Sequence, residues 1–299
     1  MEALYTKYCL HPVFKITQTT LTILQKKSLG ETFWSLDCKD DDDLEKYFEE
    51  FYKQFVKHYD RLAIDGPSAC GKSTLIQDLN PAKINQFFNI GQENNYNQIS
   101  EHSYIYININ EKLAEYPGLV TDRSVISNLA YLMTYYIMNL LANNGLFNKS
   151  LHSVCQEFID IHNLKSLLQN IKAKKLQVLI ILDSSFENMA ARVNARGLSE
   201  NSASDVIKPL CKEYHTAQIA AFAYFANYMN YPCIDLNYVR CHFDIKDDAE
   251  IFKANKKAFM RVCNFSPFTG VIDLPRVPVV VSSSILKSLH HKIMTISKR

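Results

Sequence analysis

One segment combines glycines, a lysine and three hydroxyl residues in an order that suits phosphate chemistry. It matches the pattern G-x-x-x-x-G-K-[ST] in full, through Gly66, Pro67, Ser68, Ala69, Cys70, Gly71, Lys72, Ser73 and Thr74. Small residues let the backbone curl so that its N–H groups converge on phosphate oxygens, and the following helix adds its positive end. Lys72 would bridge the β- and γ-phosphates, and Ser73 would hold Mg²⁺. The segment predicts binding of a nucleoside triphosphate, with ATP and Mg²⁺ as the cofactors.

A second segment places an acid and an arginine directly after a run of apolar residues. Residues 119–127 read L-V-T-D-R-S-V-I-S. In α/β proteins, ligands bind at the carboxyl ends of the strands. There Asp122 could hold Mg²⁺ or its waters, and Arg123 could neutralise a phosphoryl group during transfer. The alternative is a surface ion pair at a helix start, with Ser124 as the cap.

Two arginines on one predicted helix could close over the same phosphates. The helix follows residues 178–182, which form the clearest buried-strand pattern of the chain. Arg192 and Arg196 are four positions apart, so a helix puts both guanidinium groups on one face. Such a pair would exclude water and stabilise the transferred charge. The alternative is a solvated helix face.

Together, these segments resemble the deoxynucleoside kinase and thymidylate kinase superfamily of P-loop kinases, over about residues 60–260. The loop at 66–74 is similar to that of herpesvirus-type thymidine kinases and of cytidylate kinases, and residues 122–127 look like the family's E/D-R-S-x-x-S motif. The resemblance implies that Asp122 is the metal-associated acid and that Arg123 contacts the 5′ oxygen and the incoming phosphate.

The resemblance implies further site residues. Arg192 and Arg196 match the arginines of the family's lid, and Asn128 matches a position that helps to read the base. Asp235 begins a stretch similar to the one that approaches the adenine of ATP.

The acceptor side of the site has weaker candidates. The family places a catalytic glutamate after the second strand, and Glu93 is the best match, although the usual proline and tryptophan are missing. A carboxylate there would take the proton from the acceptor's 5′-hydroxyl. Tyr96 could stack on a base, and Gln98 could hydrogen-bond to it. Glu93 could equally be an ordinary loop acid.

Three functions stay open at this point. The first is ATP-dependent phosphorylation of the 5′-hydroxyl of a deoxynucleoside, with thymidine or another pyrimidine as the expected acceptor. Thymidylate kinases carry an aspartate where this chain has Ser68, which favours a nucleoside. The second is a thymidylate- or cytidylate-type nucleoside monophosphate kinase, since Asp122-Arg123 together with Ser127 and Ala130-Tyr131 is similar to thymidylate kinases. The third is a non-catalytic interaction protein on a kinase-derived scaffold, suggested by the short interval between the two motifs and by the terminal extensions.

Strand and helix patterns alternate through the middle of the chain, and these elements must position the residues above. Apolar strands are expected at residues 62–64, 118–122, 178–182 and 232–236, separated by helices. Strands that are apolar throughout predict a parallel sheet covered on both faces. The expected fold class is α/β: a P-loop NTPase three-layer sandwich with about five parallel strands flanked by helices.

The chain is expected to divide into three parts. Residues 1–59 form an N-terminal extension, 60–262 a P-loop nucleoside or nucleotide kinase-like domain, and 263–299 a C-terminal extension. Apolar residues recur at helical spacing between 44 and 56 and follow an acidic run, which predicts an amphipathic helix within the first part. The expected role of that helix is to cover the core.

Composition limits the remaining possibilities. A hydrophobic share of 47%, a charged share of 21% and a net charge of +2 are typical of a soluble globular protein without a nucleic-acid-binding surface. Eight cysteines without a C-x-x-C pair argue against zinc and favour a reducing, cytoplasmic compartment. No secretory signal and no apolar stretch of about 18 residues is found, so no membrane partner is expected. A nucleoside or nucleotide is the expected partner, and the apolar helix at 130–141 permits a homodimer.

Overall fold

Five parallel strands lie at the centre of the molecule in the order β2-β3-β1-β4-β5. The computed structural model describes residues 43–56, 62–79, 81–83, 116, 119–142, 149–174, 176–200, 211–264 and 269, with the backbone only at 82–83, 139, 141–142 and 196–200. The strands are β1 (Leu62–Asp65), β2 (Ala82–Lys83), β3 (Thr121–Asp122), β4 (Gln177–Leu182) and β5 (Cys233–Asp235). Almost every described strand side chain is buried, because helices cover both faces. The predicted α/β class with a parallel, two-sided sheet is confirmed.

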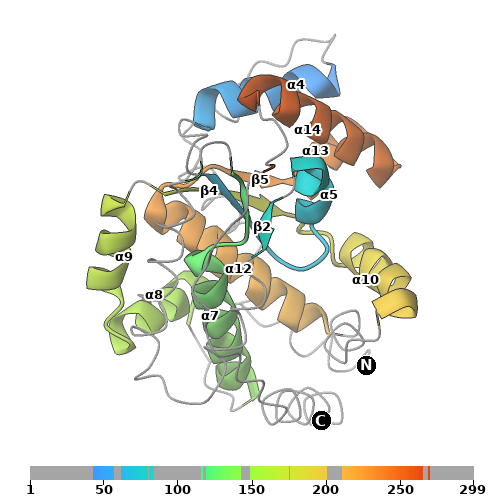
Figure 1. Cartoon of the computed structure of the whole chain (residues 1–299). Coiled ribbons are helices and arrows are strands. Elements are labelled where there is room, and N and C mark those ends of the chain that lie inside the picture. Colours follow the sequence, from blue (N-terminus) through green and yellow to red (C-terminus); the bar gives the residue numbers. More distant parts are fainter. Residues whose placement is uncertain are drawn as a thin grey trace.

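Helices form one layer on each face of the sheet (Figure 1). The upper layer in that view holds α4 (Leu44–Phe55), α5 (Lys72–Ile76, continued by a 3₁₀ turn, Gln77–Leu79), α13 (Leu236–His242) and α14 (Asp248–Cys263). The lower layer holds α7 (Val125–Ala142), α8 (Leu151–Ile161) and α12 (Lys212–Met229), with α9 (Lys165–Ala173) beside it. A further helix, α10 (Phe186–Glu200), follows β4 and lies to one side of both layers.

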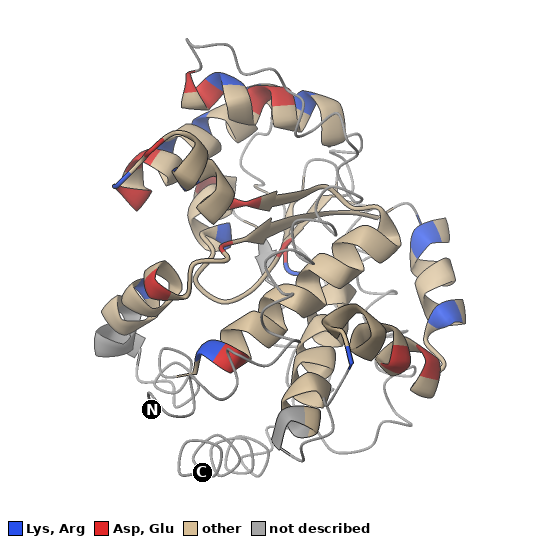
Figure 2. Cartoon of the chain, turned by 180° about the vertical axis from the view of Figure 1, so that it is seen from behind, with Lys and Arg blue, Asp and Glu red and all other residues tan. Residues whose placement is uncertain are grey.

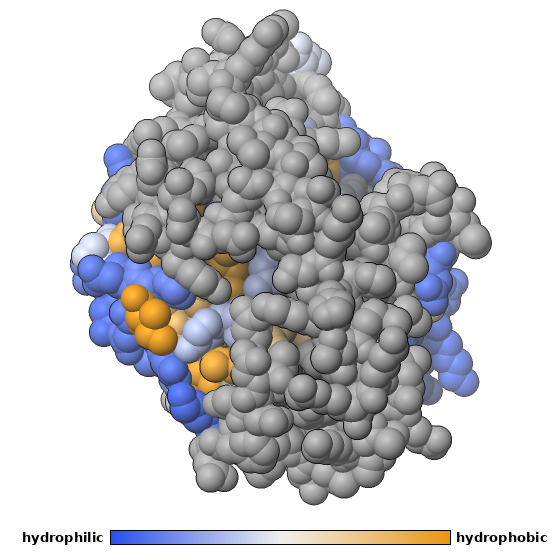
Figure 3. All heavy atoms as spheres, turned by 90° about the horizontal axis from the view of Figure 1, so that it is seen from below, coloured by the Kyte–Doolittle hydropathy of each residue, from blue (hydrophilic) through white to orange (hydrophobic). Residues whose placement is uncertain are grey.

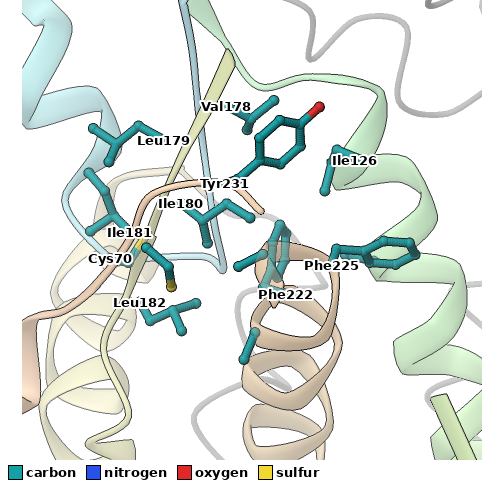
Figure 4. Packing of buried hydrophobic residues seen from close by; sticks show 14 of the residues in the cluster. Cys70, Ile126, Val178, Leu179, Ile180, Ile181, Leu182, Phe222, Phe225 and Tyr231 are labelled. Carbon is teal, nitrogen blue, oxygen red and sulfur yellow. The ribbon is translucent and has the colours of Figure 1, made fainter. Parts of the chain in front are cut away.

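Two helices of the lower layer, α7 and α12, are apolar nearly all round. The sequence of α7 contains no charged residue, and α12 carries charge only in its first turn. Helices of this composition are buried in a core. Figure 4 shows Phe222 and Phe225 of α12 and Ile126 of α7 gathered against Ile180 of β4. These contacts fix α7 and α12 against each other and under the sheet.

The predicted amphipathic helix at 44–56 is confirmed as α4, and it packs on α14. Asp43 caps its N-terminus by accepting a hydrogen bond from the amide of Glu45 at 2.9 Å. The hydroxyl of Tyr52, buried in this interface, donates to Asn255 of α14. Glu45 also pairs with Lys257 of α14 at 2.6 Å. The helix expected in an N-terminal extension therefore shares its core with a helix of the predicted 60–262 unit.

Several elements differ from the sequence-based expectation. Residues 151–173 form two helices, α8 and α9, and not one, because Asn163 between them adopts a left-handed conformation with φ of 51°. The second strand is limited to Thr121–Asp122, and β2 and α13 were not expected at all. Short elements of two to seven residues contain too few positions to show a period.

The outer surface of the described residues is mostly polar. Figure 3 shows hydrophobic side chains only in small groups between hydrophilic ones on the face seen from below. Within the described ranges, Ile161 is the one large hydrophobic residue that is clearly exposed, at 58%. No helix in the part of the chain that the structure describes is both long enough and apolar enough to cross a bilayer.

Candidate functional site

The sheet topology creates a switch point between β1 and β3. The chain leaves β1 through α5 in the upper layer and reaches β2, whereas it leaves β3 through α7 in the lower layer and reaches β4 on the other side of β1. Parallel sheets bind ligands in the crevice outside the strand ends at such a point. Here the structure brings the first two predicted segments together. Ile64 and Asp122 are register partners, and the amide of Arg123 donates to the carbonyl of Ile64 at 2.9 Å.

Residues 66–71, here called the glycine loop, connect β1 to α5. Gly66 and Gly71 have φ angles of 139° and 83°, which side chains rarely tolerate. A Cβ on Gly66 would lie 2.0 Å from the carbonyl oxygen of Ile181, and a Cβ on Gly71 would lie 2.4 Å from the ring of Phe252. Both glycines are therefore required by close packing of the loop as well as by its backbone conformation.

The ammonium group of Lys72 lies inside this loop. The side chain is 6% exposed, and its Nζ donates to the carbonyl of Gly66 at 3.0 Å and to that of Pro67. The Sγ atom of Cys70 lies 3.5 Å from the same Nζ. No carboxylate in the described ranges pairs with Lys72. A buried cation without an anionic partner is costly, so this position is suited to an anion.

A carboxylate oxygen of Asp122 is likewise left without a partner. Asp122 is 4% exposed, and its buried Oδ1 makes no hydrogen bond to the described residues. Ser73, at the second position of α5, is exposed. The described residues contain no cluster of three or more metal-ligating side chains. Because Mg²⁺ at phosphate sites typically uses one or two protein oxygens besides phosphates and waters, Asp122 and Ser73 fit this ion.

Asp65, which sequence reasoning missed, holds the two segments together. Its fully buried carboxylate accepts from the amide of Gly66 at 2.8 Å, from the amide and hydroxyl of Ser124 at 3.1 and 2.7 Å, and from the amide of Ser127 at 3.0 Å. The hydroxyl of Ser127 donates to it as well. Burial raises the pKa of Asp65, while Arg123 and these hydrogen bonds oppose the rise. The carboxylate acts as the cap of α7, so the serines of the motif have a structural role.

Arg123 joins the end of β1 to the first turns of α7. Its φ angle of 79° is unusual for a residue with a side chain. Its Nη1 donates to Ser127 Oγ at 3.3 Å, and its guanidinium carbon lies 5.7 Å from the ring centre of Tyr131. Burial acts to lower its pKa, but Tyr131, Asp65 and Asp122 raise it, with a net increase. Strained backbone of this kind is concentrated at functional sites.

Arg192 lies beside the glycine loop, but its guanidinium is engaged. Its Nε donates to the carbonyl of Ala69 at 2.7 Å, its Nη2 pairs with Asp183 at 2.5 Å, and its Nη1 pairs with Asp248. Arg240 pairs with the same two aspartates, at 3.1 Å for Asp183 and 2.5 Å for Asp248. The side chain of Arg196 lies outside the described residues. The predicted lid arginine is thus part of a four-residue ion-pair cluster in this structure.

Asp235, expected near the adenine, also has partners for both oxygens. Its carboxylate accepts from the amide of Ser184 at 3.0 Å, from the hydroxyl of Ser184 at 2.7 Å and from the amide of Asn237 at 3.1 Å. Burial raises the pKa of Asp235. The residue caps α13 and ties β5 to the end of β4.

Of the acceptor-side candidates, only Asn128 lies among the residues that the structure describes. Asn128 lies on the first turns of α7, 2% exposed, and its Nδ2 has no hydrogen-bond partner among the described residues. Glu93, Tyr96 and Gln98 all lie outside the residues that the structure describes.

Charge is distributed unevenly over the site. Figure 2 shows acidic and basic residues near the strand ends and along α4 and α14, whereas α7 and most of α12 are uncharged.

Comparison with protein-family models, with curated proteins and with solved structures found no match to the chain.

Proposed function

We propose that this protein is an ATP- and Mg²⁺-dependent phosphotransferase whose acceptor is the 5′-hydroxyl of a nucleoside, with thymidine or another pyrimidine deoxynucleoside as the expected substrate. The observation that carries the proposal is the buried ammonium of Lys72, which has no carboxylate partner within the described chain and is enclosed by the glycine loop. The loop lies at the switch point of a parallel sheet, where such sheets bind ligands.

The residues at this point can be given distinct roles. Lys72 would exchange its loop carbonyl partners for phosphate oxygens, and the start of α5 would add its amides. Asp122 and Ser73 would hold Mg²⁺, which would supply positive charge to neutralise the phosphates. Arg123, held at the same strand ends, would stabilise the phosphoryl group in transit. Asp65 would keep Arg123 and the loop in register without touching the substrate.

The family-type lid role would require Arg192 to change partners. Its guanidinium would have to leave Asp183 and Asp248 to reach a phosphate, whereas Arg240 could stay paired with both carboxylates. Arg196 would supply the second lid arginine, and Glu93 would serve as the base, as the resemblance implies.

The composition of α7 and α12, which would line the acceptor side of the site, favours a nucleoside over a nucleoside monophosphate as the acceptor. A phosphorylated acceptor brings about two negative charges, which need cationic partners. The sequence of α7 has none, and α12 has only Lys212, at its first position. The polar groups of these two helices are mostly hydroxyls and amides, which suit an uncharged acceptor.

Measurement of ADP release with ATP and Mg²⁺, against pooled nucleosides and pooled nucleoside monophosphates, tests the proposal. We expect turnover with the nucleoside pool, its loss in Lys72→Ala, and normal turnover in Lys253→Ala, where an exposed lysine of α14 is removed. Turnover only with monophosphates would replace the proposal by the nucleotide kinase alternative. Binding of ATP without turnover on either pool would favour a non-catalytic interaction protein.

A further inference from the structure

A polar patch lies between α7 and α12, in the otherwise apolar lower layer. It consists of Tyr131 and Tyr135 on α7 and of Tyr214 and Gln218 on α12. The hydroxyls of Tyr135 and Tyr214 share a hydrogen bond, and the rings of Tyr131 and Phe222 lie 6.0 Å apart, edge to face. Gln218 is one helical turn from both Tyr214 and Phe222, so it lies on the face of α12 that meets α7.

This patch begins at the reacting end of the proposed site. The hydroxyls of Tyr131 and Ser68 of the glycine loop are 3.1 Å apart, and the guanidinium of Arg123 lies over the ring of Tyr131. Tyr135, one turn further along α7, is only partly buried. The patch therefore begins beside the glycine loop and continues along α7 towards a less buried position.

Among the described residues, the amide nitrogen of Gln218 has no hydrogen-bond partner. The side chain is 3% exposed, and Nε2 makes no hydrogen bond to any described residue. An unpaired buried amide costs about 1–3 kcal/mol, which a leucine at this position would avoid. The neighbouring positions of α12 are mostly alanine and phenylalanine, so nothing in the helix itself calls for a polar residue. The unpaired donor points to a ligand that supplies an acceptor atom.

We infer that Gln218 is a specificity-determining residue for the acceptor, and that its Nε2 donates to a ring carbonyl oxygen of the acceptor's heterocyclic base. The base lies against the phenol rings of Tyr131 and Tyr135, which provide aromatic surface for a planar heterocycle. Asn128, one turn before Tyr131, supplies a second unpaired amide donor on the same side of α7. The inference rests on the proposed function, since it names what recognises the acceptor of that site.

Direct binding separates this inference from the proposed reaction. Thymidine, deoxycytidine, deoxyadenosine and deoxyguanosine are titrated calorimetrically into the full chain without ATP. We expect the wild type to prefer thymidine, and Gln218→Leu to weaken thymidine binding about 10- to 100-fold, because the base carbonyl then has no donor. Gln218→Glu should shift the preference towards deoxycytidine, because a carboxylate accepts from an exocyclic amine. A residue that served only packing would not produce this shift.

Matched variants and a second measurement keep the outcomes distinct. Asn227→Leu removes a half-buried amide from the same helix, about two and a half turns on, and should leave thymidine binding unchanged. Thermal unfolding should show Gln218→Leu to be at least as stable as the wild type, since an unpaired buried amide is removed. Wild-type levels of binding and preference in both Gln218 variants would overturn the inference, and so would failure of the wild type to bind any of the four nucleosides. Nucleoside binding that depends on Gln218 without ADP release would instead retain the inference and refute the proposed reaction.

Discussion

The two halves of the sheet edge use the same residue type in different ways. In each half, an aspartate ends or follows both strands: Asp65 and Asp122 at β1 and β3, Asp183 and Asp235 at β4 and β5. On the β4–β5 side, the four-residue ion-pair cluster and the serine contacts occupy both carboxylates. On the β1–β3 side, Asp122 keeps an oxygen without a partner in the described chain.

This difference separates groups that hold the fold from groups that are available for a ligand. Buried charges stabilise a protein only when they are paired, and the β4–β5 half meets that condition. In the β1–β3 half, Lys72 and Asp122 meet it only if a phosphate and a cation are supplied from outside. Asp65 is the exception on that side, because its hydrogen bonds tie the glycine loop to α7. Substitutions in the β1–β3 half should therefore lower activity more than stability. Substitutions in the β4–β5 half should lower stability more than activity.

The largest effect is expected for Lys72→Ala. Removal of a charge that stabilises the transferred group lowers kcat about 10²- to 10³-fold, which corresponds to roughly 3–4 kcal/mol. The free energy of unfolding should stay equal or rise, because the lysine has no carboxylate partner within the described chain. Steady-state kinetics and urea denaturation on the same preparations measure both quantities. A large loss of stability in this variant would mean that Lys72 has a structural role, like the charged residues of the β4–β5 half.

Asp183→Ala should produce the reverse pattern. The substitution leaves Arg192 and Arg240 without one of their two carboxylates, and loss of one partner of a buried pair costs about 3 kcal/mol of unfolding free energy. Asp122→Ala, on the other half, should cost less than about 1 kcal/mol, since the oxygen it removes has no described hydrogen bond to lose. Urea denaturation of the two variants compares them directly. Equal losses would mean that both halves are structural.

The layers of the fold could be predicted from the sequence, because long buried elements carry strong patterns. Residues 178–182 and the apolar helix at 130–141, which is part of α7, are examples, and the match to G-x-x-x-x-G-K-[ST] placed the loop at the correct strand end. The juxtaposition of Asp122 with the loop also followed from the parallel sheet.

The ion-pair cluster could not be predicted from the sequence. Arg192 and Arg196 showed only that they share a helix face, whereas the partners of Arg192, Asp183 and Asp248, lie 9 and 56 positions away. Such pairings depend on how α10, α13 and α14 pack together. The spacing of residues along a single helix does not reveal this. The role of Asp65 could have been predicted from the sequence, since it is an acid that ends an apolar strand directly before Gly66.

A pH effect on stability should arise from the β4–β5 half. His215 of α12 is buried, and its Nε2 lies 3.0 Å from the carbonyl oxygen of Asp183. Burial lowers its pKa to about 4. Because the folded pKa lies below the ordinary value of about 6.5, the unfolded chain binds more protons between these values. His215 therefore contributes stability above about pH 6.5 that is lost as the pH falls towards 4, roughly 2 kcal/mol between pH 7 and pH 4.5.

His215→Gln isolates this contribution, because glutamine can still donate to the carbonyl of Asp183 without titrating. The variant should lose less stability than the wild type between pH 7 and pH 4.5 in urea denaturation at several pH values. The buried carboxyls Asp65 and Asp235 have raised pKa values and act in the opposite direction in both proteins, so the difference between them reports His215. If the free energy of unfolding falls equally with pH in the two proteins, His215 has an ordinary pKa in the folded state.

The smallest effect is expected where the β1–β3 half meets the proposed acceptor patch. Tyr131→Phe removes only the hydroxyl near Ser68, a neutral interaction contributing about 0.5–1.5 kcal/mol. If that contact positions the acceptor beside the glycine loop, the acceptor KM rises a few-fold while the KM for ATP stays the same. Tyr136→Phe is the matched control, because it removes a hydroxyl bonded to Glu157 on the outer side of the same helix. Since both changes delete one hydroxyl from α7, similar unfolding free energies with an acceptor effect in Tyr131→Phe alone would locate the acceptor on the β1–β3 side. An equal acceptor effect in both variants would assign it to the general rigidity of α7.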